Sequence, residues 1–233
     1  LFAHALRRAH AITVVSGALK QLINSKYTAA SNLHVIENAI SSIFMGGHDR
    51  QTARKHFSFK PDRIYLGMAG DLSREKGIDT LMQAFMQIAA EDNRVYLILA
   101  GRKDKHLDIP DSDRIQYLGM LPHTDIPLLF SALDLGVVCI RNDDFGRYCF
   151  PQKFYEMAAC GLPIVASAVG EMKNLLALQP EILFRADDAV DMQRAIRYQL
   201  HHRQILSLPI PSWQMQAEKL NQIIRDIVWQ AGS

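Results

Sequence analysis

Residues 63–90, RIYLGMAGDLSREKGIDTLMQAFMQIAA, decide the fold class of this chain. The apolar run 63–69 has the length of a buried strand and stops at Gly70. After a charged loop, apolar residues recur at the spacing of one helix face: Ile78, Leu81, Met82, Phe85, Ile88 and Ala89. A strand, a loop and an amphipathic helix in this order form the repeating unit of a parallel α/β sheet.

The same order recurs along most of the chain. Short apolar runs predict strands at residues 11–15, 33–36, 63–69, 95–100, 115–118, 135–139, 163–166 and 181–184. Helical stripes occupy 154–159, 192–200 and 217–228. We therefore expect an α/β fold, a Rossmann-like parallel sheet with helices on both faces.

The chain divides into four predicted parts. Residues 1–40 form a first αβ fragment, and 62–210 form the main domain. Residues 41–61 have poor periodicity and a Gly46-Gly47 pair, which predicts a linker. Residues 211–233 predict one long helix, with Ser212 as its N-cap and Gly232 at its end. Because the chain opens with Leu1 inside a helical pattern, the first fragment is expected to be the end of a longer domain.

Composition narrows the function classes. Lys and Arg number 26 against 24 for Asp and Glu, and they are scattered, so we expect no nucleic-acid partner. The 3 cysteines are far apart and lack a CxxC pair, which argues against a metal site or a disulfide framework and favours the cytoplasm. Asp134 interrupts the longest apolar run, 128–140, so no membrane-spanning helix is expected.

The loop after the run 63–69 is the first candidate site. It carries Arg74 and Lys76, and a helix begins at about Gly77. Free N–H groups at a helix start, with a lysine beside them, favour a phosphate group such as a diphosphate. The alternative is that both charges are solvated loop residues. No GKS or GKT element is present, which excludes a P-loop.

The second candidate site is FPQKFYEMAACGLPIVAS, residues 150–167. It predicts a helix that starts at a proline, a stop at Gly161 and a buried strand. Glu156 lies on the same side of this helix as Lys153. An ionised carboxylate there could accept hydrogen bonds from the two hydroxyls of a ribose. The alternative is a surface ion pair between Lys153 and Glu156.

Read in order, these segments resemble family 4 of the retaining glycosyltransferases, which have the two-domain glycosyltransferase B fold. The resemblance covers nearly the whole chain. It is carried by AITVVSGALKQLI, LHVIENAIS, REKGIDTLMQAF, LILAGRKD, IQYLGMLPHTDIPLLFSALDLGVV, KFYEMAACGLPIVAS and PSWQMQAEKLNQII. It implies a C-terminal domain that binds the nucleotide sugar, preceded by the tail of an N-terminal acceptor domain to which the last helix returns.

The resemblance places Lys76 on the donor diphosphate and Glu156 on the ribose. It places the base near Gly119, Met120 and Leu121. The family often has an arginine directly after the glycine of the first strand. Asp71 stands there in this chain, so Arg74 is the candidate for the second charge.

Two departures concern the sugar end of the site. Tyr148 stands where many members have the first of two glutamates, and Asp143 and Asp144 lie just upstream. Members with a P-x-K-x-x-E block also lack that glutamate, and Lys153 belongs to such a block here. The family's glycine pair is represented by Gly170 followed by a glutamate, which leaves the Gly170 backbone as the contact.

The resemblance implies transfer of a hexose-type group from a nucleoside diphosphate sugar to a glycan or lipid-linked acceptor. It implies retained configuration, no metal and no cofactor, and a place in polysaccharide or lipopolysaccharide biosynthesis. The chain alone is expected to bind nucleotide but to transfer poorly. A peripheral contact with the inner face of the membrane would run through the acceptor domain. A non-catalytic nucleotide-sugar sensor and an epimerase of the same fold stay open. An oxidoreductase is disfavoured because no GxGxxG follows a strand.

Overall fold

The main body is a parallel sheet of 6 strands in the order β5-β4-β3-β6-β7-β8. The computed structural model describes residues 2–27 and 32–232. The strands are β3 (Ile64–Ala69), β4 (Val95–Ala100), β5 (Ile115–Tyr117), β6 (Leu135–Val138), β7 (Ile164–Ser167) and β8 (Leu183–Phe184). Every pairing in this sheet is parallel. The predicted α/β fold with a parallel sheet is confirmed.

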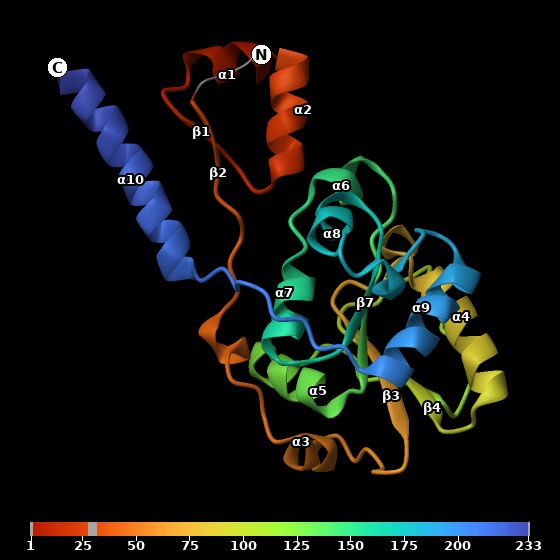
Figure 1. Ribbon diagram of the computed structural model, residues 1–233. Coiled ribbons are helices and arrows are strands. Elements are labelled where there is room, and N and C mark those ends of the chain that lie inside the picture. The colour runs from red at the N-terminus through yellow and green to blue at the C-terminus, as the bar shows by residue number, and fades with distance from the viewer. Residues whose placement is uncertain (1, 28–31, 233) are drawn as a thin grey trace.

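Helices cover both faces of the sheet (Figure 1). α4 (Ile78–Glu91) and α9 (Ala189–His202) pack against each other on one face. α5 (Ile126–Ala132) and α7 (Gln152–Ala159) pack together on the other, with α3 (Arg50–His56) against α5. The stripe predicted on α4 is buried, as the burial of Leu81 and Phe85 shows.

The strand predictions agree with the structure to within a few residues. The largest difference lies in the run 181–184, whose first residues belong to a 3-10 turn, Pro180–Ile182. Only Leu183 and Phe184 pair with β7. Proline at the start of the turn favours this local bend over an extended chain.

The first segment has its own small core. β1 (Ile12–Val14) pairs in parallel with β2 (Leu33–Val35), next to α1 (Phe2–Arg8) and α2 (Gly17–Tyr27). Val14, Ile23 and Leu33 form the buried centre. The segment lies apart from the main sheet in Figure 1.

The last helix, α10 (Trp213–Gly232), begins beside the end of the first segment. Ile40 and Ser212 form a parallel bridge. The Ser212 hydroxyl accepts a hydrogen bond from the Met215 N–H at 3.2 Å, which confirms Ser212 as the N-cap. From there α10 runs away from the main sheet (Figure 1).

Residues 41–61 contain a 3-10 turn (Ser42–Phe44) and α3, which the sequence did not predict. Phe44 and Phe59 belong to the main hydrophobic core. A helix of 7 residues is too short to show a helical period, and Asp49 starts it by accepting from the Thr52 N–H at 2.8 Å. The predicted linker thus packs on the main sheet, while the domain boundaries stay predictions.

A buried carboxylate fastens α3 to the amino ends of the strands. Asp134 is 8% exposed. Its Oδ2 accepts from Arg54 Nη2 at 2.5 Å and from the backbone N–H of Tyr65 in β3 at 2.8 Å. Arg50 pairs with the other oxygen. Because a buried charge needs partners, this cluster fixes the position of α3.

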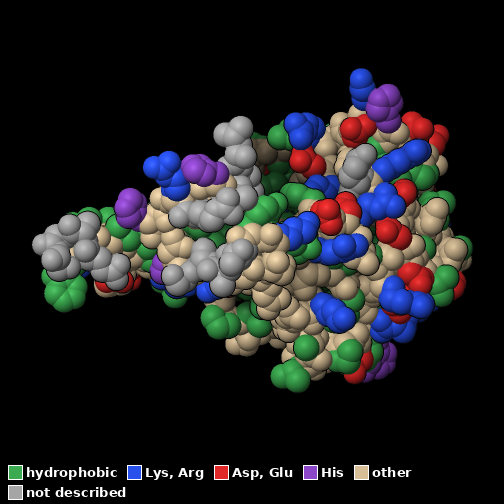
Figure 2. Space-filling model, turned by 90° about the horizontal axis from the view of Figure 1, so that it is seen from above, with side chains coloured by type: hydrophobic (Ala, Val, Ile, Leu, Met, Phe, Trp, Pro, Cys, Tyr) green, Lys and Arg blue, Asp and Glu red, His purple; other side chains and the backbone are tan. Residues whose placement is uncertain are grey.

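The surface carries charges of both signs. Figure 2 shows basic and acidic side chains interspersed on the face seen from above. Among residues 2–27 and 32–232, no helix is long and apolar enough to cross a membrane.

Replacing Asp134 should destabilise the fold strongly. In Asp134→Ala the buried Arg54 guanidinium loses its counter-ion, so the free energy of unfolding should fall by about 3–5 kcal/mol. Urea denaturation would measure it. The control is Asp62→Ala, because the Asp62 side chain is 74% exposed and its salt bridge to Arg63 Nε is long, at 3.9 Å. The control should change stability by less than about 1 kcal/mol. Equal losses in the two variants would contradict the role given to Asp134.

Candidate active site

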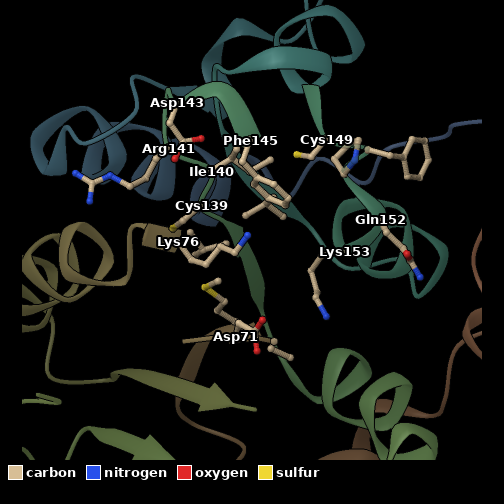
Figure 3. A pocket seen from close by; sticks show the side chains of 17 residues that line it. Asp71, Lys76, Cys139, Ile140, Arg141, Asp143, Phe145, Cys149, Gln152 and Lys153 are labelled. Carbon is tan, nitrogen blue, oxygen red and sulfur yellow. The ribbon is translucent and has the colours of Figure 1, made fainter. Parts of the chain in front are cut away.

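A cleft of about 330 Å³ opens at the carboxyl ends of β3 and β6. The chain builds β4 and β5 on one side of β3, and then β6, β7 and β8 on the other. The loops after β3 and β6 therefore diverge, which is where open α/β sheets bind ligands. The cleft is lined by Met68, Ala69, Gly70, Asp71, Lys76, Val137, Val138, Cys139, Ile140, Arg141, Asp143, Phe145, Cys149, Phe150, Pro151, Gln152 and Lys153 (Figure 3).

Two glycines shape the edge beside the cleft. Gly70 ends β3 with a φ of 137°, and Gly101 ends β4 with a φ of 121°. A Cβ at Gly101 would lie 1.9 Å from the Gly70 carbonyl oxygen, which no other residue could tolerate. A Cβ at Gly70 would lie 3.3 Å from Lys153 Cε. The missing side chains let the two strand ends approach and let Lys153 lie against the backbone.

Lys76 is a cation that lines the cleft and lies against an aromatic ring. It ends the 3-10 turn η2 (Arg74–Lys76), and Gly77, with a φ of 72°, turns the chain into α4. Its Nζ lies 3.8 Å from the centre of the Phe145 ring on α6 (Asp144–Tyr148). No salt bridge to Lys76 occurs in the described part of the chain. Its charge is therefore available for an anion.

Arg74 does not line the cleft. Its backbone carbonyl accepts a hydrogen bond from Arg141 Nη1 at 3.1 Å, and Arg141 is a cleft residue. Arg141 also pairs with Asp187 at 3.1 Å. The role given to Arg74 stays a prediction. Arg141, which was not predicted from the sequence, lies in the loop after β6 (Leu135–Val138), and its place near the carboxyl end of a predicted strand could have indicated it.

Glu156 is buried rather than exposed on the surface. Its side chain is 7% exposed, and its Oε2 lies 3.5 Å from Lys153 Nζ. Its Oε1 accepts from Gln152 Nε2 at 3.2 Å. Both partners line the cleft, although Glu156 itself does not. A buried carboxylate so held orients two donors toward the cleft.

Residues predicted near the base lie at the end of β5, outside this cleft. Met120 is 72% exposed, and Leu121 packs on the main core. The carbonyl of Gly119 accepts from the Gly101 N–H at 2.7 Å, which ties this loop to the end of β4. The assignment of Met120 and Leu121 to the base stays a prediction.

Tyr148 and Gly170 lie where the first segment meets the main body. The Tyr148 carbonyl accepts from Ser16 Oγ at 2.7 Å. Gly170 begins α8 (Gly170–Leu175), and a Cβ there would lie 2.7 Å from the Gly146 carbonyl oxygen in α6. Neither residue lines the cleft, so their roles toward the sugar stay predictions.

The two cysteines that line the cleft are poor nucleophiles. Burial raises the pKa of the Cys139 thiol to about 12 and also raises the pKa of Cys149. Both thiols are therefore protonated at neutral pH. In the described part of the chain, no group of 3 or more His, Cys, Asp or Glu side chains could hold a metal ion.

An α/β domain with a lysine in the crevice where the strand order reverses is of the class that binds phosphate-bearing ligands in that crevice. Comparison with known proteins then gives the family. The chain belongs to the glycosyl transferases group 1, whose family model matches residues 63–202.

The chain is similar to curated relatives over most of its own length. It is 26% identical over 198 residues to the lipopolysaccharide core biosynthesis mannosyltransferase LpsB of Rhizobium meliloti (strain 1021), covering 78% of this chain and 53% of that protein. It is 27% identical over 170 residues to D-inositol 3-phosphate glycosyltransferase 1 of Catenulispora acidiphila, covering 66% and 40%. The chain thus spans about half or less of the length of these relatives.

Solved structures share the fold. Sucrose-phosphate synthase from Thermosynechococcus elongatus superposes with a TM-score of 0.73 and 21% identity, over 100% of this chain and 61% of that chain. Anabaena HepE in complex with UDP superposes with a TM-score of 0.69 and 22% identity, over 86% and 56%.

The contact between the strand ends predicts an unequal response to alanine at two glycines. Gly101→Ala adds a Cβ against the Gly70 carbonyl, so the free energy of unfolding should fall by more than about 2 kcal/mol. Gly119→Ala is the control, because its φ is also positive, at 69°, but no atom lies within 4 Å of the new Cβ. The control should cost about 1 kcal/mol in urea denaturation. Losses of the same size would contradict the close approach.

Proposed function

We propose that the cleft binds a nucleoside diphosphate sugar and that the whole protein transfers its hexose-type group to a hydroxyl of a glycan or lipid-linked acceptor. The observation that carries the proposal is the Lys76 amine in the crevice at the strand-order reversal, which lies over the Phe145 ring and forms no salt bridge with a side chain that the structure describes. Membership of the glycosyl transferases group 1 supports the reaction class. The solved complex of Anabaena HepE with UDP-glucose supports the class of donor.

The donor diphosphate would lie between Lys76 and Lys153, beside the open backbone of Gly70. In the reaction, the bond between the anomeric carbon and the diphosphate oxygen breaks, and its electron pair leaves with the diphosphate. The acceptor oxygen forms the new bond to the anomeric carbon, and its proton passes to the departing diphosphate. Lys76 would stabilise the charge that develops on the departing diphosphate. Arg74 is the proposed second cation. This step needs no protein nucleophile, in keeping with the protonated cleft cysteines.

The finer features of the proposal rest on the resemblance to family 4. They are retained configuration, catalysis without metal or cofactor, and ribose recognition by Glu156. A role in lipopolysaccharide or other polysaccharide biosynthesis is supported by the similarity to a lipopolysaccharide core biosynthesis mannosyltransferase. A place in the cytoplasm, at the inner face of the membrane, is proposed from the resemblance alone. Turnover of a nucleotide sugar by the whole protein separates a transferase from a non-catalytic sensor, and product analysis separates it from an epimerase.

Titration of the chain with UDP, GDP and ADP by calorimetry would test the cleft. At least one should bind, and Lys76→Ala should weaken that binding by roughly 10- to 100-fold because a charge-assisted contact to phosphate is lost. Lys60→Ala is the matched control, since Lys60 is an exposed lysine outside the cleft. Absence of binding, or equal binding by wild type and Lys76→Ala, would overturn the proposed site.

If Glu156 binds the ribose, replacing it should reduce the discrimination between a nucleoside diphosphate and its 2′-deoxy form. Wild type should bind the preferred nucleoside diphosphate about tenfold more tightly than its 2′-deoxy form, because the carboxylate accepts from the 2′-hydroxyl. Glu156→Gln keeps the size of the buried side chain and should reduce this ratio toward one. Calorimetry on both ligands measures the ratio in each variant. An unchanged ratio in Glu156→Gln would place the ribose elsewhere.

A further inference from the structure

A second cavity lies at the opposite, amino-terminal edge of the sheet. It has a volume of about 230 Å³ and sits between α3, the end of α5, the turn from α7 to β7, and the end of α9. None of its lining residues carries a carboxylate. They are His48, Arg50, Phe130, Ser131, Leu133, Cys160, Gly161, Leu162, Pro163, Arg203 and Ile205.

Two arginines of this cavity retain most of their hydrogen-bonding capacity. Arg50 donates to Asp134 Oδ1 and makes no other side-chain hydrogen bond in the described part of the chain. Arg203 Nη1 lies 3.5 Å from the same oxygen, a distance that gives attraction but not a good hydrogen bond. The side chains are 38% and 54% exposed. Both guanidinium groups can therefore donate hydrogen bonds to a further anion.

The charges of this cluster do not balance. Arg50, Arg54 and Arg203 all pair with Asp134, and no other salt bridge to these arginines occurs among the described residues. Three positive charges thus share one negative charge, which leaves an excess of two. Burial raises the pKa of the Cys160 thiol to about 12, so this lining residue adds no negative charge. The excess equals the charge of a phosphate monoester or phosphate dianion.

The backbone conformation of Arg203 is a second feature of this site, because it is one that residues other than glycine and asparagine rarely adopt. Arg203 caps α9 in the left-handed region, with φ 51° and ψ 46°. A residue with a Cβ pays a conformational cost there, of about 1 kcal/mol, and glycine or asparagine is the usual choice. The chain instead holds an arginine at this point, which directs a guanidinium into the Asp134 cluster beside the cavity.

We infer that this cavity is a binding site for a small dianion of the phosphate class, held by Arg50 and Arg203. Guanidinium groups suit this role because their planar array of donors matches phosphate oxygens. Ser131 also lines the cavity, but its hydroxyl is already used, since it accepts from the His48 N–H at 3.0 Å and donates to the Pro127 carbonyl at 2.9 Å. The site lies at the opposite edge of the sheet from the Lys76 cleft and is independent of the proposed transfer reaction.

The test is stabilisation of the full chain by inorganic phosphate. Melting temperatures are measured over a phosphate titration against sodium chloride of equal ionic strength, each variant relative to its own ligand-free value. Wild type should gain stability. Lys76→Ala removes the cation of the proposed donor cleft and should still be stabilised by phosphate, because the cavity of Arg50 and Arg203 is intact in this variant. Arg203→Asn keeps a residue that tolerates the left-handed backbone, and its phosphate affinity should fall about tenfold.

Arg197→Gln is the matched control, because Arg197 is an exposed arginine of α9 that pairs with Glu91 instead. It should respond to phosphate like wild type. Arg50→Gln provides the decisive measurement if Arg203→Asn does not fold. A second titration with glucose 6-phosphate distinguishes a sugar phosphate from free phosphate as the tighter ligand.

Three results would overturn the inference. One is no stabilisation of wild type by either probe. Another is equal stabilisation of wild type and both arginine variants. The third is loss of the effect in Lys76→Ala, which would assign phosphate to the Lys76 cleft. Nucleotide binding by that cleft is measured separately, by the calorimetric titration.

Discussion

Parallel pairing of β3 with both β4 and β6 is the constraint on which the rest of the structure depends. It brings all strand carboxyl ends to one edge, and growth of the sheet on the two sides of β3 in turn makes the loops at that edge diverge. The crevice is therefore a product of topology. The glycines that follow β3 and β4 place no side chain at the rim of the crevice. A ligand would therefore contact the long side chains of Lys76 and Lys153.

The cations at the two edges of the sheet have different partners: a carboxylate at the amino edge and an aromatic ring at the carboxyl edge. At the amino edge, arginines form salt bridges with the buried carboxylate of Asp134, and this cluster holds α3 against the strands. At the carboxyl edge, Lys76 lies against the Phe145 ring, and no carboxylate among the side chains that the structure describes pairs with it. An aromatic ring orients an ammonium group without cancelling its charge, so a phosphate can add to that contact. The carboxyl edge thus keeps a positioned cation that the transfer proposal requires.

Long periodic segments could be predicted from the sequence, and short ones could not. The sheet strands stand out as apolar runs and α4 shows its helical period, whereas α3, α6 and α8 are too short to show one. Lys76 was predicted from its place beside a helix start and Lys153 from the P-x-K-x-x-E block, and both line the cleft. Phe145 was missed because its contact with Lys76 joins segments far apart in sequence. Such pairings depend on tertiary packing, which no local pattern encodes.

The surroundings of Lys76 depend in turn on the first segment of the chain. Ser16 is 1% exposed and donates to the Tyr148 carbonyl at the end of α6, and the Ala18 N–H donates to Glu171 Oε1 in α8 at 3.2 Å. The same short helix α6 carries Phe145 over Lys76. Five helical residues gain little stability from backbone hydrogen bonds alone, so these contacts add to the Asp143 cap, whose Oδ1 accepts from the Gly146 N–H at 2.7 Å, in holding α6 in place. The main sheet and residues 16–18 therefore both contribute to the position of the residues around the cleft. Tyr148 and Gly170 lie at the junction between these two parts and not in the cleft lining.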